Sequence, residues 1–146
     1  MPEFKRTAEA VWTGDSRHGN GLLTSGSGVL KDAPYSFFTR FGDLPGTNPE
    51  ELIAAAHAAC FNMAFASTLS GKGYQPQRIE THATCFMTRE EGSGVKITKM
   101  HLTTKGQVPN IDLATFQQIA QEAERRCPVS NVLRNGLVIE LDATLA

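Results

Sequence analysis

Two cysteines in this sequence stand in settings where a thiol could react. Cys60 lies in the apolar stretch NPEELIAAAHAACFNMA, one helical turn after His57, so the two side chains would be neighbours on a helix. Cys127 precedes Pro128, and because proline favours the first position of a helix, Cys127 is the predicted N-cap of a new helix. Unpaired N–H groups at a helix N-terminus stabilise a thiolate, the nucleophilic form of cysteine.

Each of these residues also has a purely structural interpretation. Buried cysteines are commonly inert small hydrophobes, which is the alternative for Cys60, and His57 alone would be an ordinary core histidine. Cys127 could simply separate two helices, although cysteine is not a favoured N-cap residue. Cys85 lies in the predicted strand segment THATCFM and is expected to be structural.

Glu50 and Arg40 are charged residues that could assist a thiolate. Glu50 stands beside Glu51 at the start of the predicted long helix. Both carboxylates could simply interact with the helix dipole, but Glu51 suits a capping box, which leaves Glu50 without an assigned role. Arg40 lies in the aromatic segment YSFFTRF, a predicted strand, where a charge is either exposed at an edge or paired. Glu50 and Cys60 are about 15 Å apart along a helix, so Glu50 could serve Cys60 only from a second copy of the chain.

A zinc site could be drawn from three of these residues together with a further histidine. Its ligands would be His57, Cys60, Cys127 and either His82 or His101. No CxxC or HExxH spacing supports such a site, so we expect neither a metal nor an organic cofactor.

The composition indicates an ordinary soluble protein. A chain of 146 residues suits one domain, predicted over residues 1–146, and its net charge of −1 without a basic stripe argues against nucleic acid or an anionic membrane as partner. The N-terminal MPEFKRTAEAVW lacks the apolar core of a signal peptide, and the apolar run 52–69 contains several polar residues. Three cysteines do not make a disulfide scaffold, so we expect a cytoplasmic protein.

The pattern of apolar and turn-forming residues predicts an α+β fold with antiparallel sheets. The order is β-β-β-α-β-β-α-α-β, which lacks the regular alternation of a parallel α/β sheet. The predicted strands cover 8–13, 21–25, 35–41, 78–89, 95–104 and 137–145, and EEGSG is predicted as a hairpin turn. The predicted helices are a long one over 49–70, a second one capped by Asp112, and a short one after Cys127. The long helix is apolar on nearly every side, so it must be enclosed by protein, which favours an intimate homodimer.

The stretch NPEELIAAAHAACFNMA followed about 67 positions later by CPVSNVL resembles the OsmC/Ohr family, whose names denote osmotically inducible protein C and organic hydroperoxide reductase. The segments WTGD, FFTRF and TNPEELIAAAHAACF resemble the OsmC branch, and the resemblance spans nearly the whole chain. It implies an α+β OsmC-like fold, with long buried central helices wrapped by antiparallel β-sheets in an intertwined homodimer.

The resemblance also implies a thiol-dependent peroxidase that defends against oxidative stress by reducing organic hydroperoxides and, more weakly, hydrogen peroxide. It makes Cys60 the peroxidatic cysteine and Cys127 the resolving cysteine. Arg40 and Glu50 resemble the pair that activates the thiolate across the dimer interface. An external dithiol, such as a lipoyl-type reductant, would reduce the Cys60–Cys127 disulfide, and no cofactor would be needed.

Two other functions stay open on the sequence. The first is a binder of apolar ligands, or a purely structural dimer, in which the thiols are inert. The second is a thiol–disulfide oxidoreductase whose substrates are proteins. Consumption of an alkyl hydroperoxide that depends on Cys60 separates the peroxidase from both.

Overall fold

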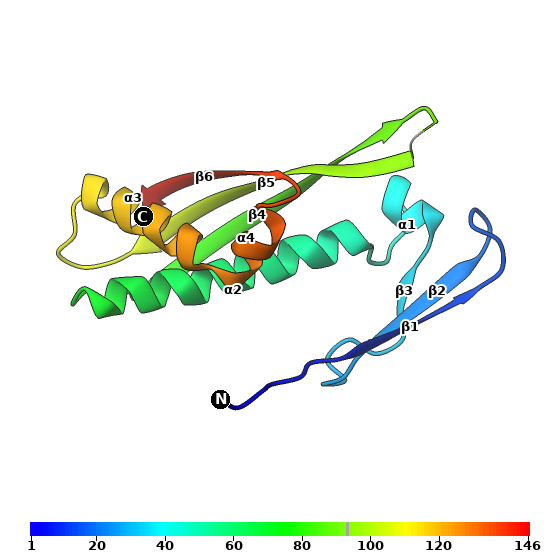
Figure 1. The fold of residues 1–146 in the computed structure, drawn as a ribbon, viewed down its shortest axis with the longest axis horizontal. Coiled ribbons are helices and arrows are strands. Elements are labelled where there is room, and N and C mark those ends of the chain that lie inside the picture. The colour runs from blue at the N-terminus through cyan, green and yellow to red at the C-terminus, as the bar shows by residue number, and fades with distance from the viewer. Residues whose placement is uncertain (93) are drawn as a thin grey trace. The chain divides into compact units, whose positions relative to one another are not determined.

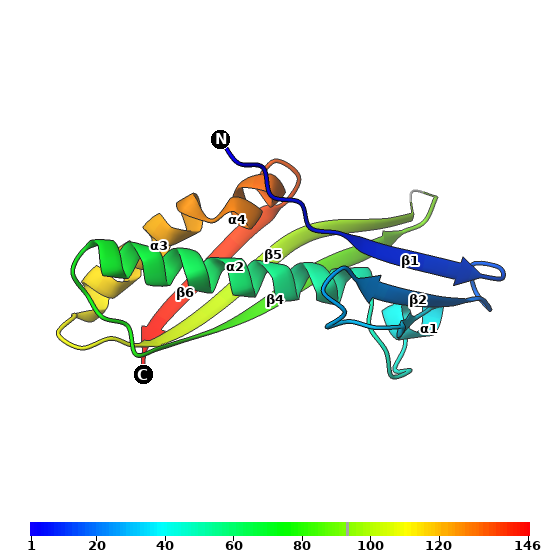
Figure 2. The same ribbon diagram turned by 90° about the horizontal axis from the view of Figure 1, so that it is seen from below.

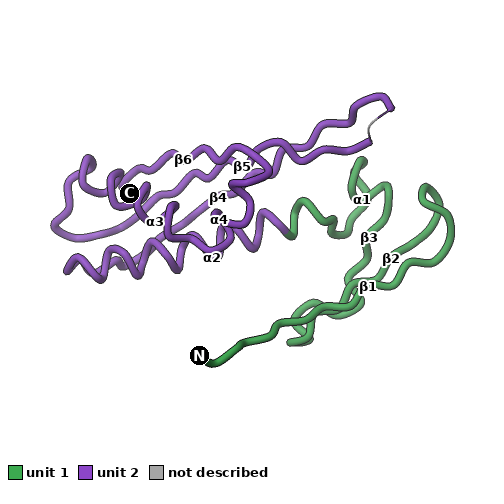
Figure 3. The backbone as a smooth tube through the Cα atoms, in the orientation of Figure 1, with its two compact units in different colours: residues 1–52 green, residues 53–146 purple. Residues whose placement is uncertain are grey.

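The computed structural model describes residues 1–92 and 94–146. The chain divides into two units, Met1–Leu52 and Ile53–Ala146 (Figure 3), and each is described by itself. The predicted hairpin turn EEGSG includes Ser93, which lies outside the described residues.

Unit 1 is a small antiparallel sheet followed by a short helix (Figure 1). Its strands pair in the order β1 (Ala8–Thr13), β2 (Asn20–Ser25) and β3 (Ala33–Tyr35). All six residues of β1 are exposed. Among the described residues, every buried hydrophobic side chain belongs to unit 2. Unit 1 therefore has no apolar core of its own.

The prediction of a strand over residues 35–41 is wrong beyond Tyr35. The segment Phe37–Phe41 forms a short helix, α1, because a capping box starts it: the Ser36 hydroxyl accepts a hydrogen bond from the Thr39 N–H at 3.2 Å, and the Thr39 hydroxyl accepts from the Ser36 N–H at 2.7 Å. This local bonding outweighs the strand preference of the aromatic residues. Arg40 consequently lies in the last turn of a helix.

The long helix α2 (Pro49–Gly71) begins and ends close to its predicted limits. The Asn48 side chain caps it, accepting a hydrogen bond from the Glu51 N–H at 2.8 Å. The Glu51 carboxylate, predicted to complete a capping box, accepts a hydrogen bond from the Thr47 hydroxyl at 2.8 Å. By length and composition α2 could cross a membrane, but it buries Phe61 and other large side chains in the core of unit 2, as a core helix of a soluble protein does.

The single chain does not enclose α2 on every side, and the prediction that a second copy of the chain covers it stays a prediction. The helix buries one face against unit 2 and leaves a stripe at helical spacing exposed. The buried face includes His57, Phe61, Phe65, Thr68 and Leu69, and the exposed stripe includes Ala55, Ala56, Ala59, Met63 and Ser67. Met63 is 75% exposed, which is unusual for a long apolar side chain.

Unit 2 contains a mixed sheet in the order β4 (Arg78–Glu90), β5 (Gly94–Gln107) and β6 (Val138–Leu145). β4 and β5 pair antiparallel, with a β-bulge between Phe86 and Met87. The prediction of wholly antiparallel sheets is wrong here, because β6 runs parallel to β5. The helices α3 (Leu113–Arg126) and α4 (Pro128–Leu133) form the crossover that parallel neighbours require.

The core of unit 2 lies between this sheet and the helices on one of its faces (Figures 1 and 2). The Phe65 and Phe116 rings join α2 to α3, with their centroids 5.0 Å apart. Each fully buried phenylalanine stabilises the fold by roughly 1.5–3 kcal/mol. The inward faces consist of Phe116, Ile119, Ala120 and Ala123 on α3 and of Ile139, Leu141 and Ala143 on β6.

Gly106 in β5 makes this packing possible. A Cβ atom at Gly106 would lie 2.6 Å from two ring carbons of Phe116. We expect Gly106→Ala to lower the free energy of unfolding by about 1–3 kcal/mol, measured by urea denaturation. Gly71→Ala is the matched control, because a Cβ there meets no atom within 4 Å. Equal stability of the two variants would contradict the close packing.

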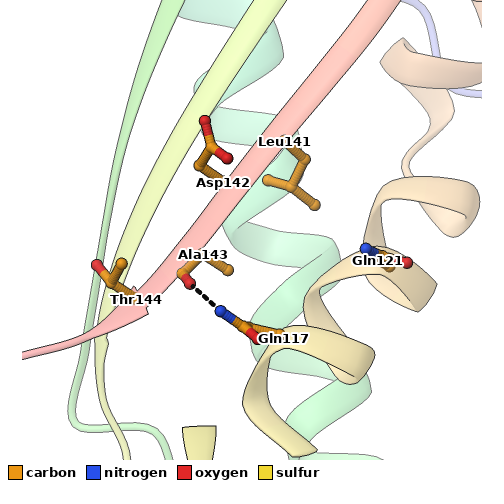
Figure 4. Close-up of a pocket in the computed structure, with 6 residues that line it drawn as sticks. All are labelled: Gln117, Gln121, Leu141, Asp142, Ala143 and Thr144. Carbon is orange, nitrogen blue, oxygen red and sulfur yellow. Dashed lines mark hydrogen bonds between the residues drawn. The ribbon is translucent and has the colours of Figure 1, made fainter. Parts of the chain in front are cut away.

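β6 is an edge strand, and α3 covers part of its edge (Figure 4). The Gln117 side-chain amide donates a hydrogen bond to the Ala143 carbonyl at 3.1 Å, so this backbone group is paired. The groove at this edge is lined by Gln117, Gln121, Leu141, Asp142, Ala143 and Thr144. Its residues bear no thiol, and the Gln117 bond leaves one backbone acceptor fewer at this edge for another strand.

Candidate active site

The fold brings Cys60 and Cys127 together, although 67 residues separate them in the sequence. Cys60 is held by α2, and Cys127 lies at the corner where α3 ends and α4 begins. The two side chains are neighbours in the core of unit 2, and both thiols are free. Cys127 is fully buried, whereas Cys60 is partly accessible. An accessible thiol beside a buried thiol is a suitable arrangement for forming a disulfide.

The predicted N-cap role of Cys127 is confirmed. Its backbone is extended (φ −70°, ψ 118°), Pro128 follows at the first helical position, and the sulfur accepts a hydrogen bond from the Ser130 N–H at 3.5 Å. The Cys127 N–H itself bonds to the Glu124 carbonyl at 3.3 Å, which closes α3. The same residue thus ends one helix and starts the next.

The surroundings of Cys60 within the chain favour its protonated form. Burial raises the pKa of the Cys60 thiol, and the neighbouring Cys127 thiol raises it further, while a hydrogen bond from the Val129 backbone N–H opposes both. A thiol must lose its proton to attack a peroxide. Rapid reaction at neutral pH therefore requires an additional positive charge near Cys60.

Arg40 and Glu50 form a two-point ion pair within unit 1. Arg40 Nε donates to Glu50 Oε1 and Oε2 at 3.0 and 3.1 Å, and Arg40 Nη2 donates to Oε1 at 2.5 Å. Asn48 aligns the two helices that carry the pair, because its amide donates to the Thr39 carbonyl at 3.2 Å while its oxygen caps α2. Glu50 is 4% exposed, so its charge is held by the guanidinium rather than by water.

The four predicted site residues thus form two pairs. Arg40 and Glu50 belong to unit 1, and Cys60 and Cys127 belong to unit 2. The pairing of Arg40 with Glu50 that the family resemblance implies is present within unit 1.

His57 has a polar partner that sequence reasoning missed. Its Nε2 is 2.7 Å from the Ser130 hydroxyl, and both residues are fully buried. Burial lowers the pKa of His57, with Arg134 lowering it further and Glu124 opposing the shift, so the ring is neutral at neutral pH. Ser130 is the third residue after the N-cap Cys127, and this spacing could have pointed to a polar contact at the start of α4.

A second missed contact fixes the other end of α4. Arg134 donates to the Glu124 carboxylate at 2.8 Å and to the Glu124 carbonyl at 3.3 Å, linking the end of α4 to the last turn of α3. The Glu124 side chain is largely buried in this pair. The corner that bears Cys127 is therefore held by the Arg134–Glu124 ion pair as well as by the His57–Ser130 hydrogen bond.

The remaining candidate residues lie on the sheet. His101 pairs with Asp142 at 2.7 Å between β5 and β6, His82 is exposed on β4, and Cys85 lies opposite Met100 in the β4–β5 ladder. Within residues 1–92 and 94–146, no three His, Cys, Asp or Glu side chains are grouped to hold a metal ion. The chemistry that the candidate site offers is therefore that of the Cys60 and Cys127 thiols.

Comparison with known proteins gives a consistent picture. The family model for OsmC-like proteins matches residues 41–142. The chain is 44% identical to peroxiredoxin OsmC of Escherichia coli over 135 residues, which cover 92% of this chain and 94% of that protein. The crystal structure of organic hydroperoxide resistance protein OhrB of Bacillus subtilis is 26% identical, with a TM-score of 0.74 and coverage of 94% of this chain and 98% of that one.

A further solved structure supports the fold. The organic hydroperoxide resistance protein of Elizabethkingia anophelis superposes with a TM-score of 0.79 over 100% of both chains, at 24% sequence identity. The expected α+β OsmC-like architecture, with a central helix and two small sheets, is therefore confirmed. By the family match and by its similarity to peroxiredoxin OsmC, this chain belongs to the OsmC family.

Proposed function

We propose that this protein is a thiol peroxidase that reduces organic hydroperoxides and, more weakly, hydrogen peroxide, in defence against oxidative stress. The observation that carries the proposal is the contact between the Cys60 and Cys127 thiols. The similarity to a peroxiredoxin supports it, because peroxiredoxins act through cysteine. The partly accessible Cys60 is the residue that meets the peroxide, and the buried Cys127 resolves the product.

The reaction proceeds in three balanced steps. The Cys60 thiolate attacks one peroxide oxygen, the O–O bond breaks, and with one proton the products are an alcohol and a Cys60 sulfenic acid. The Cys127 sulfur then attacks the Cys60 sulfur, the S–O bond breaks, and water leaves with the Cys127 proton. An external dithiol, such as a lipoyl-type compound, reduces the resulting disulfide by exchange and is itself oxidised to a disulfide.

The active form in this proposal is a homodimer in which Arg40 and Glu50 of one copy serve Cys60 of the other. Burial raises the pKa of Cys60 within one chain, so a guanidinium from elsewhere must lower it. Glu50 would hold that guanidinium by the two-point pair already present in unit 1. A second copy would cover the exposed stripe of α2 and the sheet of unit 1, which has no apolar core of its own.

We infer that residues 1–146 work as one OsmC-like domain in the cytoplasm. The family match over 41–142 runs across the boundary between the two units, which supports a single functional module. A reducing compartment suits the cycle, because the Cys60–Cys127 disulfide must be reduced after every turnover.

The test is turnover of cumene hydroperoxide and of hydrogen peroxide with dithiothreitol as reductant. We expect kcat/KM to be at least about tenfold higher for the organic peroxide, because apolar side chains surround Cys60. The chain alkylated with iodoacetamide serves as the control and should be inactive. Sedimentation at the assay concentration should show a dimer.

Other results would support the competing functions. No peroxide consumption, together with binding of an apolar ligand, would replace the proposal with a binding protein. Faster reduction of insulin disulfides than of cumene hydroperoxide would indicate a protein oxidoreductase. A monomer that is fully active would refute the shared site.

A further inference from the structure

We propose that His57 is a positioning residue for the disulfide-forming step, holding Cys127 against Cys60 through Ser130. This inference rests on the proposed function for its kinetic consequence, but the positioning itself can be tested without peroxide. His57 does not touch the reacting sulfurs in this proposal; it acts through the start of α4.

Three contacts in series run from His57 through Ser130 and Cys127 to Cys60. His57 Nε2 is 2.7 Å from the Ser130 hydroxyl, the Ser130 N–H donates to the Cys127 sulfur at 3.5 Å, and the Cys127 thiol contacts Cys60. His57 and Cys60 are one turn apart on α2. One rigid helix therefore carries both the reacting thiol and the anchor of its partner thiol.

α4 needs such an anchor because it has only six residues. A helix of this length does not form on its own in water, so tertiary contacts must fix its position. The Arg134–Glu124 pair fixes its C-terminal end to α3, and the His57–Ser130 bond fixes its N-terminal end to α2. The second contact joins α4 to the helix that bears Cys60, and the bond from the Val129 N–H to the Cys60 sulfur lies beside it.

The buried position of His57 is energetically unfavourable for a histidine, because one of its ring nitrogens lacks a hydrogen-bond partner among the described residues. Its Nδ1 is buried without a hydrogen-bond partner among the described residues, and the whole side chain is inaccessible. An apolar residue would fill this place without leaving a polar atom unpaired. A histidine there is explained by the single bond that it makes, which is the bond to Ser130.

The bond matters most when the Cys127 sulfur attacks the Cys60 sulfenic acid. Attack requires the Cys127 sulfur to lie in line with the S–O bond of the Cys60 sulfenic acid. Such positioning supplies much of the rate enhancement of intramolecular reactions. Loss of the bond leaves α4 free to shift, so the thiols meet less often. The first reaction, between Cys60 and the peroxide, involves α4 only as the source of the Val129 N–H bond to the Cys60 sulfur, so its rate is expected to change much less than that of disulfide formation.

The first experiment measures the Cys60–Cys127 disulfide at equilibrium in glutathione redox buffers. We expect His57→Leu and Ser130→Ala each to lower the effective concentration of the two thiols roughly tenfold, the effect of one net hydrogen bond. The double variant should be no worse than either single variant, because all three lack the same bond. His57→Gln, which retains a side-chain amide, should recover part of the loss.

Thr68→Val is the matched control. Thr68 is buried in the same helix, but its hydroxyl donates to the Ala64 carbonyl within α2 and not to α4. We expect it to change stability without changing the disulfide equilibrium. Additive losses in the double variant, an equal loss in Thr68→Val, or a disulfide that becomes more stable in His57→Leu would overturn the proposal.

The second experiment separates the two chemical steps by stopped flow with cumene hydroperoxide. We expect His57→Leu to react once with the peroxide within about twofold of the wild-type rate, and to form the disulfide roughly tenfold more slowly. A dimedone trap should then capture more sulfenic acid. Equal slowing of both steps would refute a role confined to Cys127. A wild-type chain that forms no sulfenic acid would refute the peroxidase function and leave the equilibrium result to decide the positioning.

Discussion

Cys60→Ser is expected to abolish peroxide turnover, with kcat/KM for cumene hydroperoxide falling by more than about a thousandfold. A serine hydroxyl is far less nucleophilic than a thiolate at neutral pH and cannot accept the peroxide oxygen as a sulfenic acid. The measurement is steady-state consumption of peroxide with excess dithiothreitol. A single-turnover experiment on the same variant should show no reaction of its remaining thiols.

Cys127→Ser and Cys85→Ser provide the comparison. Cys127→Ser should oxidise once at Cys60 and accumulate the sulfenic acid, because no neighbouring thiol remains to form the disulfide. Cys85 lies on β4 and is not among the pair in contact, so Cys85→Ser should retain activity within about twofold. Full activity of Cys60→Ser would show that Cys60 is a packing residue and would favour the ligand-binding function.

Arg40→Met is expected to lower the rate of the first step about a hundredfold or more at pH 7. Without the guanidinium, the pKa of Cys60 stays above the ordinary thiol range because of burial, and the thiolate fraction is small. The variant rate should then rise about tenfold for each pH unit until the pH exceeds this raised pKa. The wild-type rate should change little over the same range, because its thiolate is already formed.

Mixing two inactive variants tests whether Arg40 acts across the dimer. In heterodimers of Arg40→Met with Cys60→Ser, one site combines the intact Cys60 of the first chain with the intact Arg40 of the second. After random exchange of subunits from equal amounts, about a quarter of the wild-type sites should be restored. If Arg40 instead serves Cys60 of its own chain, the mixture will show no gain over the separate variants.

Several features could be predicted from the sequence because local rules determine them. Proline after Cys127 and asparagine before Pro49 mark helix starts that depend only on neighbouring residues, and both are confirmed. The alternation in β6 reveals its inward face for the same reason. The two cysteine motifs needed the family resemblance, since no local rule brings residues 67 positions apart into contact.

Other features were missed because their causes are less local or compete with one another. Four aromatic residues within 35–41 favour a strand, but the Ser36 cap produces α1 in place of its second half. The parallel pairing of β6 depends on how far α3 and α4 carry the chain, which composition does not encode. The bond from His57 to Ser130 spans 73 positions, so neither residue indicates the other in sequence.

The parallel pairing of β5 with β6 also bears on the order in which the protein folds. The hairpin of β4 and β5 joins neighbouring segments, whereas the pairing of Lys99 with Val138 must first close a long loop that contains both α3 and α4. Loop closure of this kind costs chain entropy before any contact compensates for it, so it belongs to the late phase of folding. Cys127 lies inside that loop. We therefore expect the Cys60–Cys127 disulfide to form efficiently only after most of unit 2 has folded.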